Sequence, residues 1–305
     1  MLRKKSIFMA IISSLLSTSS FGSTVAPYSL ETHLSVTTFD NDSSTALDTS
    51  LSGTFFVSPV EKEEYVPLGE ASFISKTTKL FGTLNQTTVE AKAGDIVTVA
   101  GDDQTSSSSN LMHLGFEHVF SATDVIVGAS GFQSSTNDAD YDSSGLQWVF
   151  GIYLNDATRV TYTHHESKTE FGSGSVDFTT NQFSLRDFYA RENGTGLGWE
   201  FSYQDIDPTY SPPFLVASHE KLTLGVDKYF NAEQSIGVKF HLDSFEIDLV
   251  LDQAPPNKEQ KRSYFFYYQH FFTTRAAYRL SFRFSEKVFD EVDSKGLGAS
   301  LLVRF

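Results

Sequence analysis

The chain has 305 residues, with 28 Phe, 13 Tyr and no cysteine, and its 38 acidic and 23 basic residues give a formal net charge of −15. Such an acidic excess argues against nucleic acid as a partner, because phosphates demand a basic face. The absence of cysteine excludes zinc–thiolate sites and cysteine nucleophiles, and it fits an exported protein that does not rely on disulfides.

The first 23 residues predict a cleaved secretory signal peptide. Basic residues at positions 3–5 precede an apolar run over residues 7–16, which is too short to span a bilayer. Small residues follow, so we predict cleavage near Ser23, which leaves residues 24–305 as a single domain. The alternative is an amphipathic first helix of a cytoplasmic protein.

Apolar and polar residues alternate along most of the chain downstream of about Asn110. Clear runs cover residues 146–154, 197–204, 221–227 and 278–285. Runs of about ten residues are long enough for a tilted strand to cross the hydrocarbon layer. No stretch after the signal approaches the roughly 18 uninterrupted apolar residues of a membrane helix, so a helical membrane protein is excluded.

The connections between these runs alternate between short and long. Residues 121–123 and 155–156 form short links, whereas residues 133–144 and 166–174 form long ones. Short periplasmic turns and longer external loops produce this pattern in an up-and-down barrel, and a soluble β-sandwich would not require it. The sequence therefore predicts an all-β fold, a transmembrane antiparallel up-and-down β-barrel of a Gram-negative outer membrane.

The strand count is predicted as fourteen, with twelve or sixteen as alternatives, and an even count places both termini in the periplasm. The predicted strands start near Tyr28, Ala46, Lys79, Asn110, Asp124, Leu146, Ala157, Asp177, Gly196, Lys221, Gln234, Ser263, Arg275 and Gly296. The segment 58–103 is ambiguous, because residues 71–74 and 95–100 could be further strands or a packed loop. A slip of apolar parity in residues 234–251 predicts a β-bulge near Asp243 or Ser244.

Aromatic residues gather at the ends of the predicted strands, as in the girdles at the two membrane interfaces. Examples are Phe120, Phe150, Tyr203, Phe230, Tyr268, Phe271 and Phe272. Between residues 264 and 272, aromatic residues occupy both parities. This predicts that the strand packs there against an inward loop or against another protomer.

The last strand ends on an aromatic residue. Leu301, Val303 and the terminal Phe305 share one face of an alternating run. This run resembles the C-terminal signature of outer-membrane barrels, and the resemblance implies an assembly signal read by the barrel-assembly machinery. An edge strand that ends on Phe by chance is the alternative.

A second resemblance concerns residues 66–74, which read Val-Pro-Leu-Gly-Glu-Ala-Ser-Phe-Ile. They resemble the Pro-Leu-Ala-Glu-Ala-Ala-Phe-Leu element of the general bacterial porin family of Gram-negative outer-membrane β-barrels, and depart from it at Gly69, Ser72 and Ile74. The resemblance spans essentially the whole mature chain. It implies a porin, through which small hydrophilic solutes or ions diffuse passively in a water-filled lumen.

Charged residues on the polar face of the strands are the candidate lining of that lumen. The predicted pore-lining residues are Arg159, Arg275, Arg279, Arg283, Arg304, Lys239, Glu117, Glu200 and Asp227, and Asp243 has the same parity. Arg275, Arg279 and Arg283 share one face of one strand. If acidic residues oppose this basic stripe, a transverse field would orient and select solutes. The alternative is that the arginines pair with carboxylates or with a folded-in loop to fill the interior.

Other functions are weaker alternatives. An anchor, an adhesin or a ligand-specific uptake barrel would have the same strand pattern, and a barrel hydrolase would need His164, His165 or His219 beside an acid. The histidines are scattered over many strands, so we predict no metal site, no cofactor and no enzyme. Expected partners are outer-membrane lipid and lipopolysaccharide near the acidic external loops, with a homotrimer as one open oligomeric state.

Overall fold

The computed structural model describes most of the chain. It covers residues 27–41, 44–61, 66–91, 106–137, 141–172, 174–191, 194–211, 215–249, 257–287 and 294–305. The predicted signal peptide and residues 95–100 lie outside these described residues. Within the described part, no helix is long and apolar enough to cross a membrane.

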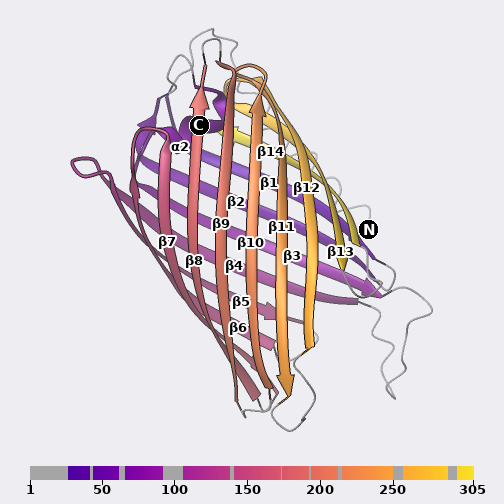
Figure 1. The fold of residues 1–305 in the computed structure, drawn as a ribbon. Helices are drawn as coiled ribbons and strands as arrows, with labels where there is room; N and C mark the ends of the chain where they lie inside the picture. The colour runs from indigo at the N-terminus through magenta and orange to yellow at the C-terminus, as the bar shows by residue number, and fades with distance from the viewer. Residues whose placement is uncertain are drawn as a thin grey trace.

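Fourteen antiparallel strands of the described residues close into one barrel, as predicted (Figure 1). The strands are β1 (Tyr28–Asp40), β2 (Ser44–Val60), β3 (Lys79–Ala91), β4 (Ser106–Phe120), β5 (Val125–Thr136), β6 (Tyr141–Tyr153), β7 (Thr158–Phe171), β8 (Gly174–Ala190), β9 (Gly196–Ser211), β10 (Leu215–Tyr229), β11 (Gln234–Leu249), β12 (Asn257–Thr273), β13 (Ala276–Lys287) and β14 (Ser294–Arg304). Each strand pairs with the next along the chain, and β1 pairs with β14 to close the ring. We call the end where β1 begins and β14 ends the periplasmic end, following the orientation expected for an even strand number.

The predicted strand starts are accurate at the periplasmic end and late at the external end. Strands that start at the periplasmic end begin within one residue of the prediction, as β5 does at Val125 against Asp124. Strands that start at the external end begin earlier than predicted, as β10 does at Leu215 against Lys221. The predicted long link over residues 166–174 is wrong, because β7 continues to Phe171. The chain pairs as strand where the sequence suggests loop.

The predicted β-bulge near Asp243 or Ser244 is also wrong. The register of β11 against β10 runs without a shift from Ser235 to Leu249. Phe245 therefore shares the inner face with Asp243, and its ring stacks on that of His219 at a centroid distance of 3.9 Å. The backbone register of β11 is unchanged, but toward the external end the apolar residues move from the outer face of the strand to the inner face. This change of face explains the slip of parity in the sequence.

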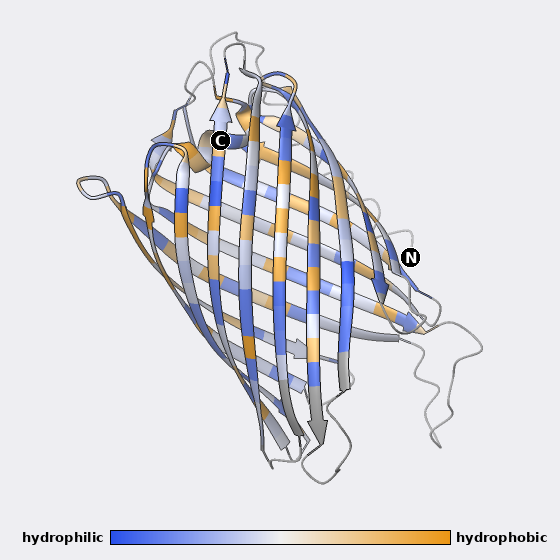
Figure 2. Cartoon of the chain, in the orientation of Figure 1, coloured by the Kyte–Doolittle hydropathy of each residue, from blue (hydrophilic) through white to orange (hydrophobic). Residues whose placement is uncertain are grey.

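The outer wall of the barrel is apolar along the middle of the strands. Large apolar side chains such as Leu224 and Val226 are 45% and 49% exposed, and hydropathy alternates along the strands (Figure 2). Exposed aliphatic side chains over a whole wall are expected where lipid, and not water, is the solvent. The wall therefore matches the apolar band of a transmembrane barrel.

The connection between β2 and β3 folds across the periplasmic end of the barrel. We call its described part, residues 66–78, the strap. It contains a short 3₁₀ helix, η1 (Leu68–Glu70), and one helical turn, α2 (Ala71–Ile74). Residues 71–74 are therefore part of a packed loop, which was one of the two predicted alternatives, and they form no strand.

Three buried apolar clusters fix the strap to strands around the ring. Leu68 packs with Phe271 and Ala277, Ala71 packs with residues of β1 and β2, and Phe73 packs with residues of β4, β5, β6, β8 and β10. Because these strands lie on different sides of the barrel, the strap crosses the lumen. Of the two alternatives predicted for residues 264–272, packing against an inward loop is confirmed at Phe271, which contacts the strap. The prediction of Phe271 as a girdle residue is wrong, because its side chain is buried inside the barrel.

Candidate pore lumen

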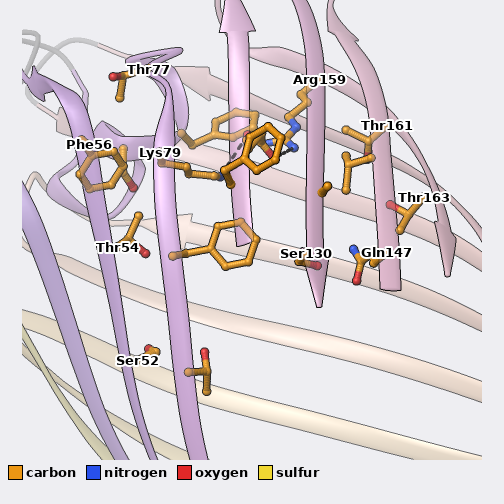
Figure 3. A pocket seen from close by; sticks show the side chains of 18 of the residues that line it. Ser52, Thr54, Phe56, Thr77, Lys79, Ser130, Gln147, Arg159, Thr161 and Thr163 are labelled. Carbon is orange, nitrogen blue, oxygen red and sulfur yellow. Dashed lines mark hydrogen bonds and ion pairs between the residues drawn. The ribbon is translucent and has the colours of Figure 1, made fainter. Parts of the chain in front are cut away.

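A polar cavity lies inside the barrel next to the strap. It has a volume of about 610 Å³, and its lining includes hydroxyl and amide side chains from β2, β5, β6 and β7 (Figure 3). Those shown in the figure include Ser52, Thr54, Ser130, Gln147, Thr161 and Thr163. These side chains are short and uncharged, and they can donate and accept hydrogen bonds. Such a wall suits water and hydrophilic solutes.

An ion cluster lies on one side of this cavity. Glu117 on β4 accepts a hydrogen bond from Arg159 Nη2 at 2.6 Å and forms an ion pair with Lys79 Nζ at 3.1 Å. Lys79 and Arg159 point toward each other from β3 and β7 (Figure 3). The cluster contains two cations and one anion, so it keeps an excess positive charge. The two predicted pore-lining residues, Arg159 and Glu117, thus both face the lumen, and Lys79 was missed.

The strap carries a carboxylate deep inside the barrel. Glu70 is 1% exposed, and its two oxygens accept hydrogen bonds from Arg186 Nη2 on β8 at 2.8 and 2.7 Å. Tyr229 on β10 donates a third hydrogen bond to Glu70 at 2.5 Å. A buried carboxylate is tolerable only when it is paired and hydrogen-bonded in this way. Glu70 therefore anchors the strap to the far side of the lumen.

The end of the strap is tied to the periplasmic turns. Lys76, which has a positive φ of 49°, forms ion pairs with Asp124 at 3.1 Å and with Asp156 at 2.9 Å. Partial burial disfavours the charge of Lys76, but hydrogen bonds to the two carboxylates outweigh this and raise the pKa of the amine above its ordinary value. Tyr153 holds the middle of the strap by donating a hydrogen bond to the Phe73 carbonyl at 3.1 Å.

Three further predicted pore-lining residues form pairs across the inner wall. Lys239 forms an ion pair with Glu200 at 2.5 Å, and Asp227 accepts a hydrogen bond from Tyr267. These contacts favour the alternative in which charges pair to fill the interior. They reduce the net field that each group exerts on a passing solute.

Of the four arginines of the predicted basic stripe, only Arg279 and Arg283 form a stripe on the inner wall. Arg304 is buried at 2% exposure and pairs with Glu31 at 2.9 Å. Arg279 and Arg283 share the inner face of β13. Arg275 is not part of the stripe, because it lies in the turn before β13 and is exposed. The prediction for Arg275 is wrong, because it started the strand one residue too early, within the turn that precedes Ala276.

Two of the three histidines considered for catalysis lie beside an acid, and they are on different strands, β7 and β10. The His164 imidazole contacts Asn181 and Glu166, while His165 packs against Phe132. The Nε2 atom of His219 lies 3.3 Å from Oδ1 of Asp243. Within the described residues, no group of three or more His, Asp and Glu side chains could hold a metal ion.

The predicted assembly signal closes the barrel. Leu301 is paired with Leu34 of β1, and the Phe305 amide donates a hydrogen bond to the Leu30 carbonyl at 2.8 Å. The Phe305 side chain is 43% exposed, and Val303 is buried. These contacts explain why the last strand is needed for closure, and its recognition during assembly stays a prediction.

Comparison with known proteins shows the fold. No protein-family model and no curated protein matches the sequence, so the predicted membership of the general bacterial porin family is not confirmed. Omp33 of Acinetobacter baumannii has a similar structure, with a TM-score of 0.55 at 15% identity over 92% of this chain and 99% of that chain. The toluene transporter TodX of Pseudomonas putida gives a TM-score of 0.52 at 10% identity over 92% and 90%.

These matched structures and the apolar outer wall agree. Omp33 is an outer-membrane protein and TodX is a toluene transporter, and this chain shares their overall β-barrel fold, with its strands closed into one ring. The protein is therefore an outer-membrane β-barrel, as the alternation of its strands predicts.

Proposed function

We propose that the protein is a porin through which small hydrophilic solutes or ions diffuse passively across the outer membrane. The polar cavity of about 610 Å³ inside the barrel carries this proposal. Hydroxyl and amide groups replace part of the hydration of a passing solute without binding it tightly, which favours conduction. The strap narrows the periplasmic end and sets an upper limit on solute size.

The lining favours hydrophilic solutes over the hydrocarbon named for TodX. Sites for hydrocarbons are lined mainly by apolar and aromatic side chains, whereas Ser130, Gln147 and Thr161 contribute to this cavity. The strap sequence supports the further proposal that the chain is a remote relative of the general bacterial porins. We propose no catalytic step and no cofactor for this barrel.

The same proposal has consequences for partners. The apolar wall would contact outer-membrane lipid and lipopolysaccharide, and the terminal run ending at Phe305 would be read by the barrel-assembly machinery. A homotrimer would bury part of the outer wall, and cross-linking in mild detergent would reveal it.

Reconstitution tests the function. In a planar bilayer, the purified mature protein should produce stepwise ion conductance, and liposomes that contain it should swell in small sugars faster than in larger ones. Absence of both conductance and swelling, with a folded barrel shown by heat-dependent gel migration, would contradict a porin. Swelling only in apolar solutes would favour a hydrocarbon channel.

A further inference from the structure

The inner wall over β13, β14 and β1 has a positive charge that the described residues leave uncompensated. Arg159, Lys239 and Arg304 each have a carboxylate partner, but Arg279 and Arg283 have none among the residues that the structure describes. Although the chain as a whole is strongly acidic, this stretch of wall is basic. Two unpaired guanidiniums in a lumen attract anions.

The Arg279 guanidinium is held in a fixed orientation. Its Nε and Nη2 atoms donate hydrogen bonds to Gln269 Oε1 at 3.0 and 2.5 Å, and its carbon lies 4.3 Å from the centroid of the Tyr267 ring. These contacts use one edge and one face of the group. Its remaining N–H donors are available, because a guanidinium has five, and the side chain lines a second cavity of about 230 Å³.

Hydroxyl groups lie between the two arginines. Arg279 and Arg283 are four residues apart on β13, which places their Cα atoms about 13 Å apart. Ser281 lies between them and is in register with Gly298 of β14, which is in register with Thr37 of β1.

Gly298 makes room for the hydroxyl groups of its two neighbours, Ser281 and Thr37. A Cβ atom at this position would lie 2.5 Å from Ser281 Oγ and 2.9 Å from Thr37 Oγ1. The Ser281 and Thr37 hydroxyls therefore approach the glycine from both neighbouring strands and occupy the space that a side chain would fill there. The side chain of Arg283 extends nearby, with its guanidinium carbon 5.7 Å from the centroid of the Phe39 ring.

We propose that this patch is an oxyanion-binding site in the lumen wall, formed by Arg279, Arg283, Ser281 and Thr37 and suited to small solutes that carry a carboxylate or a phosphate. Guanidiniums bind such groups through paired, charge-assisted hydrogen bonds, and hydroxyls add further donors. Glu31 borders the second cavity but is paired with Arg304, so its repulsion of an anion is reduced. The inference rests on the proposed function, since it names the solute class that the channel favours.

Zero-current potentials in a potassium chloride gradient, followed by addition of succinate or phosphate, test this site. The wild-type channel should prefer chloride over potassium, and succinate or phosphate should reduce the chloride current with a saturable concentration dependence. In the Arg279→Gln/Arg283→Gln variant, the blocking constant should weaken at least about tenfold, because charge-assisted hydrogen bonds are lost. Block by succinate alone or by phosphate alone would identify which solute the site accepts.

Arg191→Gln/Arg275→Gln is the matched control, because it also removes two positive charges, from exposed positions outside the strands of the inner wall. It should behave as the wild type does. Equal shifts in the control and in the double variant would show an effect of overall charge and overturn the site. Calorimetric titration of the detergent-solubilised barrel with succinate separates the two proposals, because binding without conductance would retain the site and reject the channel.

Discussion

The periplasmic end and the middle of the barrel have opposite kinds of interior. At the periplasmic end, the strap packs against the inner wall through buried apolar side chains, such as Leu68 against Phe271, each 2% exposed. In the middle, half-buried polar side chains such as Gln147 line an open cavity. The first region is packed as a globular protein core is, whereas the second has a polar wall that water can solvate. Stability should therefore depend mainly on the first region, and solute selection on the second.

Replacement of the strap should give the largest effect. A Gly-Ser chain of equal length in place of residues 68–76 removes Leu68, Ala71 and Phe73 from the three buried clusters. We expect single-channel conductance to rise severalfold and the unfolding temperature to fall, because both the obstruction and its packing are lost. Unchanged conductance from a folded barrel would show that the strap does not limit flow.

Matched Phe→Ala substitutions test the contrast between the two interiors. Phe271→Ala should lower the free energy of unfolding by about 3–5 kcal/mol, since it opens a cavity in a dry cluster. Phe81 faces the large polar cavity and is only half-buried, so Phe81→Ala should cost about 1 kcal/mol. Denaturant unfolding in detergent measures both values. Equal losses would mean that the middle of the barrel is packed as tightly as the end.

Removal of the Glu70 anchor should have the next largest effect. Glu70→Ala leaves Arg186 without its carboxylate, and we expect a loss of about 2 kcal/mol, less than for a fully buried pair because the Arg186 side chain is 39% exposed. The Glu70→Ala/Arg186→Ala variant should lose less than the sum of the single losses, which a double-mutant cycle measures. Glu200→Ala is the control. It also removes the carboxylate of an ion pair, but the Glu200 side chain is 29% exposed whereas that of Glu70 is 1% exposed, so its loss of stability should be smaller. If the losses in unfolding free energy of the two single variants add up to that of the double variant, the ion pair between Glu70 and Arg186 does not anchor the strap.

The sequence predicts the parts of the barrel that local patterns encode. Periplasmic turns have local signals, such as Asn155, whose side chain accepts hydrogen bonds from the amides of Ala157 and Thr158. The alternation of the strands predicts the inner face correctly, so Arg279 and Arg283 are placed correctly. In β11 the apolar face changes toward the external end, so alternation alone does not reveal that the strand continues there.

The anchor of the strap could not be predicted in the same way. Glu70 and Arg186 are 116 residues apart, and nothing in the sequence near either residue indicates the other. The only local signal was the apolar character of residues 66–74, which is unusual for a connection between strands. A buried carboxylate in such a segment requires a partner, but only the closed ring determines that this partner lies on β8.

The smallest effect is expected at Lys76, which ties the strap to two turns. Lys76→Ala should cost at most about 1 kcal/mol, because Asp156 is 94% exposed and Asp124 is 41% exposed. The pKa of Lys76 is raised above its ordinary value of 10.5, so its contribution is complete below pH 10.5 and is lost as the pH rises through the higher folded-state pKa. Unfolding temperatures of the wild type and of Lys76→Ala should therefore differ slightly at pH 8 and converge in strongly alkaline buffer. A difference that persists at the alkaline end would assign the effect to packing of the lysine side chain over the Tyr153 ring, where Nζ lies 5.2 Å from the centroid, and would rule out the ion pairs of Lys76 as its cause.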